Sequence, residues 1–379
     1  MTDISELIVR RAEAIERGKG FSIPLRDMPS ASIIDKEKAL VNKLSSENKS
    51  VIKKELVKLY TAVYADGNSG LVRDFGAVGS RKSEVLIVCD KRTKQELWIK
   101  YANTLVSAKE VWKNNLGIDE LNNAQALEAT LYLSHGPLHN VSLKAQKTAD
   151  VQINHEPKKS IAQIIDFCNR YFFNPVHVKG ISGQQRKELE FLLTAVEDHN
   201  NKIKTFQKES LAKDIYKFKD SIISLASNSE PVTLTAYDFQ LPNLFDYAGK
   251  LFLGDLGLAY DRAISARDKG FKMMWGNPAF PLGFLVESTS QNPRICSAFK
   301  EQLEILVARF VYQNEWLDSY DGQVLRLKSP FNFQLKKFLY GLGQFYGGML
   351  KVRTNELAAE EDRRKIRELV TRYTKAPSK

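Results

Sequence analysis

Three polar residues in the segment 237–259 have the types and the spacing of a phosphoryl-transfer site. Asp238 is followed five residues later by Asn243, and Asp255 stands seventeen residues after Asp238. Phosphoryl transfer uses a carboxylate at the acceptor hydroxyl, and it uses an amide and a second carboxylate to hold magnesium against the phosphates. Hard oxygen ligands of this kind suit magnesium. The alternative interpretation is that Asp238 and Asn243 only form a turn and that Asp255 ends a strand.

Short strands must position these side chains. The sequence predicts strands over 232–237, 244–247 and 250–253, with a turn at Ala248-Gly249 between the last two. A loop followed by a tight hairpin can bring side chains from both of its ends to one edge of a sheet. We therefore expect the three polar side chains to meet at this edge.

The segment resembles the catalytic loop, β-hairpin and magnesium loop of the protein-kinase-like superfamily, which includes aminoglycoside phosphotransferases and related small-molecule kinases. The resemblance implies that Asp238 is the catalytic base, that Asn243 is a magnesium ligand, and that Asp255 is the main magnesium ligand in a variant of the Asp-Phe-Gly motif. It implies ATP and Mg2+ as cofactors. Asp246, inside the hairpin, matches no position of the family.

A small lobe of the same family is expected upstream. Two apolar runs within 84–102 predict a β-hairpin, and Lys100 near its end resembles the strand lysine that contacts the α- and β-phosphates. Gly76 and Gly79 precede the hairpin and resemble a degenerate glycine-rich loop. Glycines there let backbone N–H groups approach phosphates without a Cβ in the way.

In the family the strand lysine pairs with a glutamate on the next helix. Glu110, Glu120 and Glu128 are all candidates. Glu120 lies twenty residues beyond Lys100, close to the usual separation in the family, so it is the predicted partner.

The sequence departs from the family at several places. Ala236-Tyr237 stand where a His or Arg usually precedes the catalytic aspartate, Gln240 replaces a Lys or His, and proline falls one place late, at Pro242. The long span between Lys100 and Asp238 implies an insertion, which the lysine-rich segment 183–227 could supply. These changes leave the predicted base and metal positions intact but put acceptor handling in doubt.

The nature of the acceptor is suggested by the segment 275–281, Trp-Gly-Asn-Pro-Ala-Phe-Pro, which resembles the end of a protein-kinase activation segment. This favours a protein substrate. The alternative interpretation is a proline-rich loop that packs aromatic side chains.

Composition restricts the remaining classes. The chain has 379 residues and a net charge of +11, which favours polyanionic ligands, but no zinc finger or RNA-recognition signature accompanies the charge, so nucleic acid is not the expected partner. Cys89, Cys168 and Cys296 are too far apart for a disulfide framework or a paired-cysteine zinc site. No apolar run approaches the roughly 18 residues of a spanning helix. We expect a cytoplasmic protein.

Helical spacing of apolar residues predicts helices over 3–18, 36–65, 104–134, 160–173, 183–227, 295–320, 332–351 and 355–374. The segment 135–159 is expected to be a connection with some strand content. His135 and His139 have helical spacing, but Gly136-Pro137 between them argues against a zinc site on a helix. Gly341 and Gly343 predict close helix packing.

Together these patterns predict an α+β, two-lobed protein-kinase-like fold with helical N- and C-terminal extensions. The expected divisions are a helical extension (1–65), a small β-rich nucleotide-binding lobe (66–134) and a larger mainly helical lobe with the catalytic hairpin (135–379). The expected function is an ATP- and magnesium-dependent kinase, first of all a divergent serine/threonine protein kinase. A small-molecule kinase and a pseudokinase or basic interaction module without catalysis are the alternatives.

Overall fold

The structure is a computed structural model. It describes residues 31–44, 48–64, 72–77, 83–89, 96–126, 129–143, 146–147, 152–202, 220, 222–247, 249–256, 271–317, 324–325 and 331–351. The helices expected over 3–18 and 355–374 lie outside these ranges. The chain divides into two compact units, one of Met1–Gln146 with Gly254–Leu256, the other of Lys147–Leu253 with Gly257–Lys379.

The first unit is built on a five-stranded antiparallel sheet with the order β1-β2-β3-β5-β4. Its strands are β1 (Val72–Ala77), β2 (Glu84–Cys89), β3 (Glu96–Tyr101), β4 (Tyr132–His135) and β5 (His139–Leu143). The hairpin predicted over 84–102 is confirmed as β2 and β3, which pair along their whole length. The expected boundary at residue 134 falls within β4.

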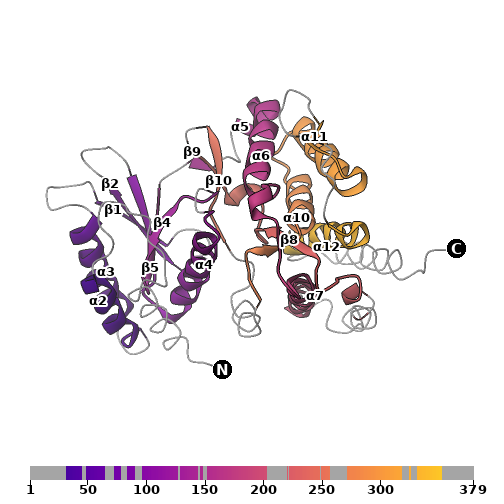
Figure 1. The fold of residues 1–379 in the computed structure, drawn as a ribbon. Coiled ribbons are helices and arrows are strands. Elements are labelled where there is room, and N and C mark those ends of the chain that lie inside the picture. Colours follow the sequence, from indigo (N-terminus) through magenta and orange to yellow (C-terminus); the bar gives the residue numbers. More distant parts are fainter. Residues whose placement is uncertain are drawn as a thin grey trace. The chain divides into compact units, whose positions relative to one another are not determined.

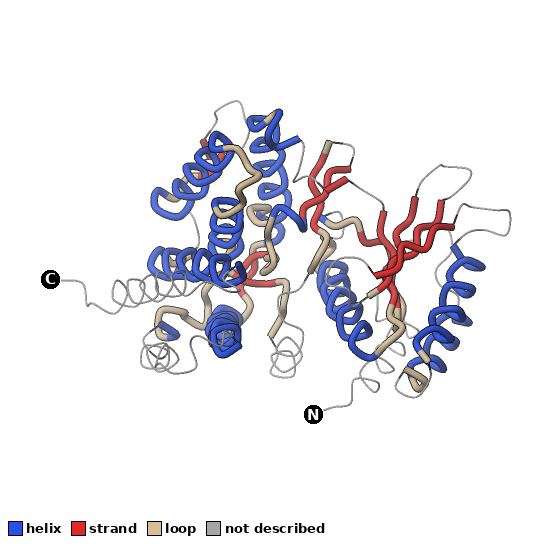
Figure 2. The backbone as a smooth tube through the Cα atoms, turned by 180° about the vertical axis from the view of Figure 1, so that it is seen from behind, coloured by secondary structure: helices blue, strands red, loops and turns tan. Residues whose placement is uncertain are grey.

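Helices cover both faces of this sheet (Figures 1 and 2). Helices α2 (Ala31–Val41) and α3 (Lys49–Tyr64) lie on one face, and α4 (Leu105–Asn123) lies on the other. The Tyr60 ring of α3 contacts the Tyr101 ring of β3 at 5.8 Å between centroids. The two N-terminal helices are therefore part of the sheet unit.

A buried polar network joins the N-terminal helices to the sheet. The Glu37 carboxylate on α2 accepts hydrogen bonds from Tyr60 of α3 and from the backbone N–H of Leu138, and it lies 2.6 Å from Nδ1 of His139 on β5. The hydroxyl oxygen of Tyr64 lies 2.7 Å from Nε2 of His139. Burial first, and the Glu37 charge second, raise the pKa of Tyr60 well above its ordinary value.

Two predicted helices of the first unit differ from the structure. The range 36–65 contains two helices, because the chain turns after Val41 and starts again at Lys49. The range 104–134 is helical only to Asn123, since Gln125 has a positive φ of 56° and ends the helix, and Tyr132 already belongs to a strand. Apolar residues continue at helical spacing past this turn, so periodicity alone could not locate the end.

The second unit is mainly helical. Its helices are α5 (Gln152–His155), α6 (Pro157–Tyr171), α7 (Gln184–Lys202), α10 (Ala279–Ser290), α11 (Ser297–Ala308), a π-helical turn (Arg309–Gln313) and α12 (Phe333–Lys351), with 3-10 turns at Pro175–His177 and Leu241–Asn243. None of the helices in the described part of the chain is long and apolar enough to cross a membrane.

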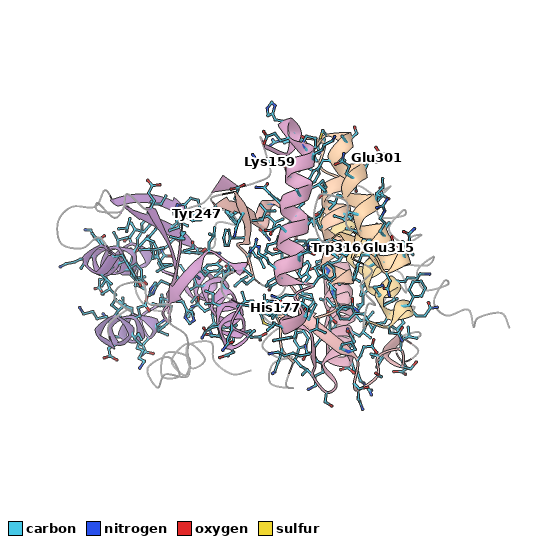
Figure 3. The ribbon with its side chains drawn as sticks, turned by 45° about the horizontal axis from the view of Figure 1, so that its top comes forward. Lys159, His177, Tyr247, Glu301, Glu315 and Trp316 are labelled. Carbon is cyan, nitrogen blue, oxygen red and sulfur yellow. The ribbon has the colours of Figure 1, made fainter. Side chains whose placement is uncertain are left out.

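Small strands complete this unit. They are β7 (Lys179–Gly180), β8 (Pro231–Leu234), β9 (Leu244–Tyr247), β10 (Lys250–Leu253), β11 (Trp275–Gly276), β12 (Trp316–Leu317) and β13 (Val324–Leu325), and β6 (Gln146–Lys147) lies at the boundary between the units. The predicted hairpin over 244–253 is confirmed, with Tyr247 beside its turn (Figure 3). The sheet β11-β8-β7 supports the loop that follows β8.

The helix predictions in this unit are confirmed in part. Helix α7 accounts for 184–202 of the range 183–227, of which 203–219 lies outside the described residues. The range 295–320 was too long, because the helix passes into a π turn at Arg309 and then into β12. Helix α10 was not predicted, because it is buried on nearly all sides and shows no polar face.

Helices α10 and α12 pack with their backbones in contact. A Cβ added to Gly343 would overlap the carbonyl oxygen of Phe280, and one added to Gly283 would overlap the carbonyl oxygen of Tyr340. The close helix packing predicted from the glycines at 341–343 is thereby confirmed. Because the opposing atoms are backbone, neither helix can yield by a side-chain rotation.

Gly343→Ala should therefore destabilise the protein by about 1–3 kcal/mol, the cost of overpacking a filled core. Gly180→Ala is the matched control, since a Cβ at Gly180 meets no atom within 4 Å. Chemical denaturation followed by circular dichroism measures both. Equal free energies of unfolding for the two variants would contradict the close backbone contact.

Candidate functional site

Asp238 lies in a turn after β8 and its carboxylate is held from within the loop. The Gln240 side-chain amide donates to Asp238 Oδ1 at 2.7 Å, and the backbone N–H of Gln240 donates to the Asp238 carbonyl oxygen at 3.1 Å. Gln240 is one of the departures from the family pattern. In this structure it fixes the orientation of the predicted base.

Asn243 is tied to the same loop. Its side-chain Nδ2 donates to the Asp238 carbonyl oxygen at 2.9 Å, and its backbone N–H donates to the Gln240 carbonyl oxygen at 2.9 Å. The 3-10 turn Leu241–Asn243 gives the chain this close return, and Pro242 suits it because its missing N–H is not needed there. With the nitrogen bonded inward, the amide oxygen is the atom of Asn243 that can bind a cation.

Helix α12 adds a tyrosine to the surroundings of Asp238. Burial, and then the nearby Asp238 charge, raise the pKa of Tyr346 above its ordinary value. The Tyr346 ring contacts Phe280 and Phe284 of α10, with centroids 6.2 and 5.8 Å apart. Sequence reasoning missed Tyr346, because it lies more than a hundred residues from the loop and no motif points to it.

The hairpin after the loop returns the chain to its starting end. Leu244 pairs with Leu253, so the chain enters and leaves β9–β10 at the same end. Asp246 accepts hydrogen bonds from Gln163 of α6 at 2.6 Å and from the backbone N–H of Gly249 at 3.0 Å. Asp246 therefore stabilises the turn, which explains why an acid inside the hairpin matches no catalytic position.

Lys100 lies on the central strand of the first unit. It pairs with Val85 on β2 and with Asn140 on β5, and paired residues project from the same face of a sheet. Asn140 donates to Asn115 of α4 at 3.1 Å. Lys100 is therefore on the face that α4 covers, and its side chain is partly exposed.

Asp255 follows the hairpin and belongs to the first unit. The backbone N–H of Leu256 donates to Asn114 Oδ1 of α4 at 3.3 Å, and Tyr132 donates to the same oxygen at 3.1 Å. Gly117 of α4 leaves the room that the Leu256 side chain fills. Burial, and then the Asp255 charge, raise the pKa of Tyr132 well above its ordinary value.

The structure gives fewer contacts for the other predicted nucleotide-binding residues, Gly76, Gly79 and Glu120. Gly76 lies in β1 beside a bulge in the β1–β2 pairing. Gly79 lies outside the described residues. Glu120 is in the last turn of α4, and the ion pairs of the described residues do not include one between it and Lys100. The first unit thus holds Lys100, Glu120, Gly76 and Asp255, and the second holds Asp238 and Asn243.

The segment 275–281 is buried. Trp275 and Gly276 form β11, Asn277 and Phe280 are fully buried, and helix α10 begins at Ala279. The interpretation as a proline-rich loop that packs aromatic side chains describes this segment. The described side chains of segment 275–281 are buried, so they form no accessible surface for a peptide.

Glu188 on α7 is the main contact of this buried segment. Both of its carboxylate oxygens accept from the backbone N–H of Asn277 at 3.0 Å, and Tyr237 donates to one of them at 3.2 Å. Burial raises the pKa of Glu188 to about 8, although its hydrogen bonds from Asn277, Gln185 and Tyr237 act in the opposite direction. The sequence analysis predicted a lysine-rich helix here and no buried acid.

A buried stripe on α7 was the signal that could have revealed Glu188. Gln184, Glu188, Leu192 and Ala195 recur at helical spacing and are all buried. Two polar residues within an apolar stripe indicate buried hydrogen bonds rather than a solvated face.

Three histidines, His135, His139 and His177, have polar partners in the described chain. His135 lies 2.9 Å from Asp119 of α4, and His139 belongs to the Glu37 network. His177 lies beside the end of α6 and contacts the Tyr171 carbonyl oxygen at 3.0 Å (Figure 3). His135 and His139 are on paired strands and not on a helix.

Neither a family model nor a curated protein matches the sequence. Similar solved structures include a choline/ethanolamine kinase family protein from Mesorhizobium loti, at 12% identity, covering 86% of this chain and 96% of that one, with a TM-score of 0.44. A Plasmodium vivax ethanolamine kinase is 12% identical to this chain, and the match covers 93% of this chain and 96% of that one with a TM-score of 0.47. An ADP-bound aminoglycoside phosphotransferase has 13% identity, 85% and 96% coverage and a TM-score of 0.44.

The buried carboxyl of Glu188 should make stability depend on pH. A carboxyl with a raised pKa in the folded state binds its proton more tightly there, so folding is favoured at low pH and stability is lost as the pH rises from about 4.5 to about 8. Glu188→Gln removes this pH-dependent contribution to the free energy of unfolding. Relative to the variant, the wild type should lose stability across that window by up to a few kcal/mol.

Urea denaturation at a series of pH values measures the difference. Glu190→Gln is the control, because the Glu190 side chain is partly exposed on the same helix and pairs with Arg186 at 3.4 Å. Parallel pH curves for the wild type and Glu188→Gln would show that Glu188 keeps an ordinary pKa.

Proposed function

We propose that the protein is an ATP- and magnesium-dependent phosphotransferase that transfers phosphate to a hydroxyl group of a small molecule. The observation that carries the proposal is the loop 238–243. Its amide nitrogens bond inward, to the carboxylate and carbonyl of Asp238, and leave the Asn243 oxygen for a cation. A turn with no further role would not need a base fixed by one amide and a second amide fixed beside it.

The oxygens in this part of the chain fit magnesium. Asp255 supplies a carboxylate and Asn243 an amide oxygen, both hard ligands that this metal prefers. Along the chain, Asn243 immediately precedes β9, and Asp255 comes two residues after the last residue of β10. When bound, the metal would neutralise charge on the phosphates of the nucleotide.

Lys100 is proposed to contact the nucleotide phosphates, with Gly76 and Gly79 in the preceding loop and Glu120 as its partner. The support is the position of Lys100 on a central strand, on the face that α4 covers. Gly254–Leu256 packs on the same helix through Asn114 and Gly117. Helix α4 therefore contacts both the neighbourhood of the proposed lysine and the segment that carries Asp255.

Asp238 is proposed to receive the proton of the acceptor hydroxyl. Gln240 orients its carboxylate, so the base needs little reorganisation when the acceptor binds. The basic residue that usually precedes this aspartate is replaced by Tyr237, which fixes the loop differently, through its hydroxyl on Glu188.

The acceptor is proposed to be a small molecule and not a protein. The expectation of a protein substrate depended on the segment 275–281, and its described residues are buried in contact with α7. The solved structures named above are a choline/ethanolamine kinase family protein, an ethanolamine kinase and an aminoglycoside phosphotransferase. They fit the alternative of a small-molecule kinase better than a protein kinase.

If Lys100 and Asp255 hold the nucleotide, ATP with magnesium should raise the thermal stability of the wild type. A ligand at a hundred times its dissociation constant adds about 2.7 kcal/mol by mass action, which a melting curve detects easily. Lys100→Ala and Asp255→Asn should lose this shift in melting temperature. Any shift that remains in Asp255→Asn should not depend on magnesium. The controls are Lys58→Ala and Asp35→Asn, both exposed in the first unit. An undiminished shift in both site variants would refute this placement of the phosphates.

Asp238→Asn should separate binding from chemistry. Nucleotide binding should remain near normal, because the carboxylate faces the acceptor, while turnover should fall by roughly 10²-fold or more through loss of a positioned base. Radiolabelled ATP with a panel of small-molecule alcohols and proteins measures transfer, and calorimetry measures binding. Asp220→Asn, at an exposed position, is the control. Wild-type protein that binds ATP but labels nothing would favour the pseudokinase.

A further inference from the structure

Glu188 is a buried carboxyl that the proposed phosphoryl transfer does not use. It is fully buried, and its hydrogen bonds come from the uncharged groups of Asn277, Tyr237 and Gln185. Across the described residues, no ion pair includes it. Burial of a carboxyl among neutral donors costs more than burial of an apolar side chain of similar size. Its place in the fold therefore calls for a physical reason.

The carboxyl bridges two segments that leave the same pair of strands. Strands β8 and β11 are antiparallel, and the Thr235 N–H extends their pairing by donating to the Met274 carbonyl oxygen at 2.8 Å. The chain after β8 leads through Tyr237 to Asp238, and the chain after β11 leads through Asn277 to helix α10. Glu188 accepts hydrogen bonds from both.

The second segment is fixed closely around the carboxyl. Gly276 passes so near to Glu188 that an added Cβ would overlap the carboxylate. Asn277 gives its N–H to Glu188 and uses its side-chain oxygen to accept from the Ala279 N–H at 3.0 Å, at the start of α10. The Glu188 carboxyl therefore contacts the two residues that precede Pro278 at the start of α10.

Helix α10 leads back to Asp238 by a second route. Its Phe280 contacts Tyr237 at 5.8 Å between centroids, and it also contacts Tyr346, whose pKa responds to the Asp238 charge. A shift of Asn277 would thus reach Asp238 both along the loop and through the aromatic contacts of α10.

We propose that Glu188 is a positioning residue for the catalytic loop, which fixes Asp238 through the Tyr237 hydroxyl and the backbone of Asn277. The inference rests on the proposed function, because it takes Asp238 as the base. Displacement of a reacting group by about 1 Å can cost two orders of magnitude in rate, so a hydrogen bond one residue from the base can control turnover without touching the substrate.

Two single variants and their combination test the proposal. Glu188→Gln keeps the shape of the side chain, and Tyr237→Phe removes only the hydroxyl. Each should lower kcat by roughly tenfold or more and leave the KM for ATP within about twofold. Because the Tyr237 hydroxyl is proposed to act through its hydrogen bond to Glu188, which the Glu188 variant already disturbs, the double variant should be no slower than the slower single variant. Glu190→Gln, at the partly exposed neighbour on α7, should match the wild type.

Amide hydrogen exchange of residues 235–243 gives a readout that does not depend on activity. Exchange should be faster in Glu188→Gln and Tyr237→Phe than in the wild type and unchanged in Glu190→Gln. Unchanged exchange in both site variants, or kcat losses that simply multiply in the double variant, would overturn the positioning role. If the wild type transfers no phosphate, the proposed function fails and the exchange result alone decides on Glu188. If Glu188→Gln does not fold, Tyr237→Phe decides.

Discussion

A carboxyl group removed from water must find hydrogen-bond partners, and this constraint organises each of the two units. In the first, Glu37 on α2 collects Tyr60, His139 and the Leu138 backbone around a single buried side chain. In the second, Glu188 on α7 collects Tyr237, Gln185 and the Asn277 backbone. Apolar contacts supply most of the driving force for burial, but they permit many arrangements. The directional bonds to these two carboxylates select one.

The same principle explains how the proposed catalytic loop keeps its shape without the residues that usually support it. A basic side chain before the base would need an anionic partner, whereas Tyr237 needs only an acceptor and finds it in Glu188. Gln240 and Asn243 add neutral amide bonds to Asp238. The loop is thus built from uncharged donors, and its electrostatic character is left to the carboxylate of Asp238.

The sequence predicted the two hairpins, because turn residues and β-branched runs are local signals. It placed the end of β8 too late, since the strand ends at Leu234 rather than at residue 237, and it did not predict the two-residue strands such as β7 and β11. The hairpin 244–253 and the pair β2–β3 came out with the expected ends. Spacing and the family resemblance together pointed to Asp238 and Asn243, which share one loop in the structure, and their catalytic roles stay predictions. Helix ends were less predictable, since Gln125 adopts a left-handed conformation that no rule of composition required. Helix α10 was missed because complete burial removes the polar face that marks a helix in sequence. Glu188 and Tyr346 were missed because their roles depend on contacts between segments far apart in the chain.

Because α2 and α3 are attached to the sheet, the smallest segment of the first unit that can be exchanged between related genes includes both helices. His139 on β5 is completed by groups from α2 and α3, and Glu84 of β2 binds Lys53 of α3 at 2.5 Å. A fragment that began at the first strand would lack Glu37 and Tyr64, the partners of the His139 ring, and Lys53, the cationic partner of Glu84. In recombination between related genes, a crossover placed between α3 and β1 would separate residues that are chemically one group. The junctions tolerated by such exchanges should therefore lie before residue 31, whatever sequence periodicity suggests about residue 65.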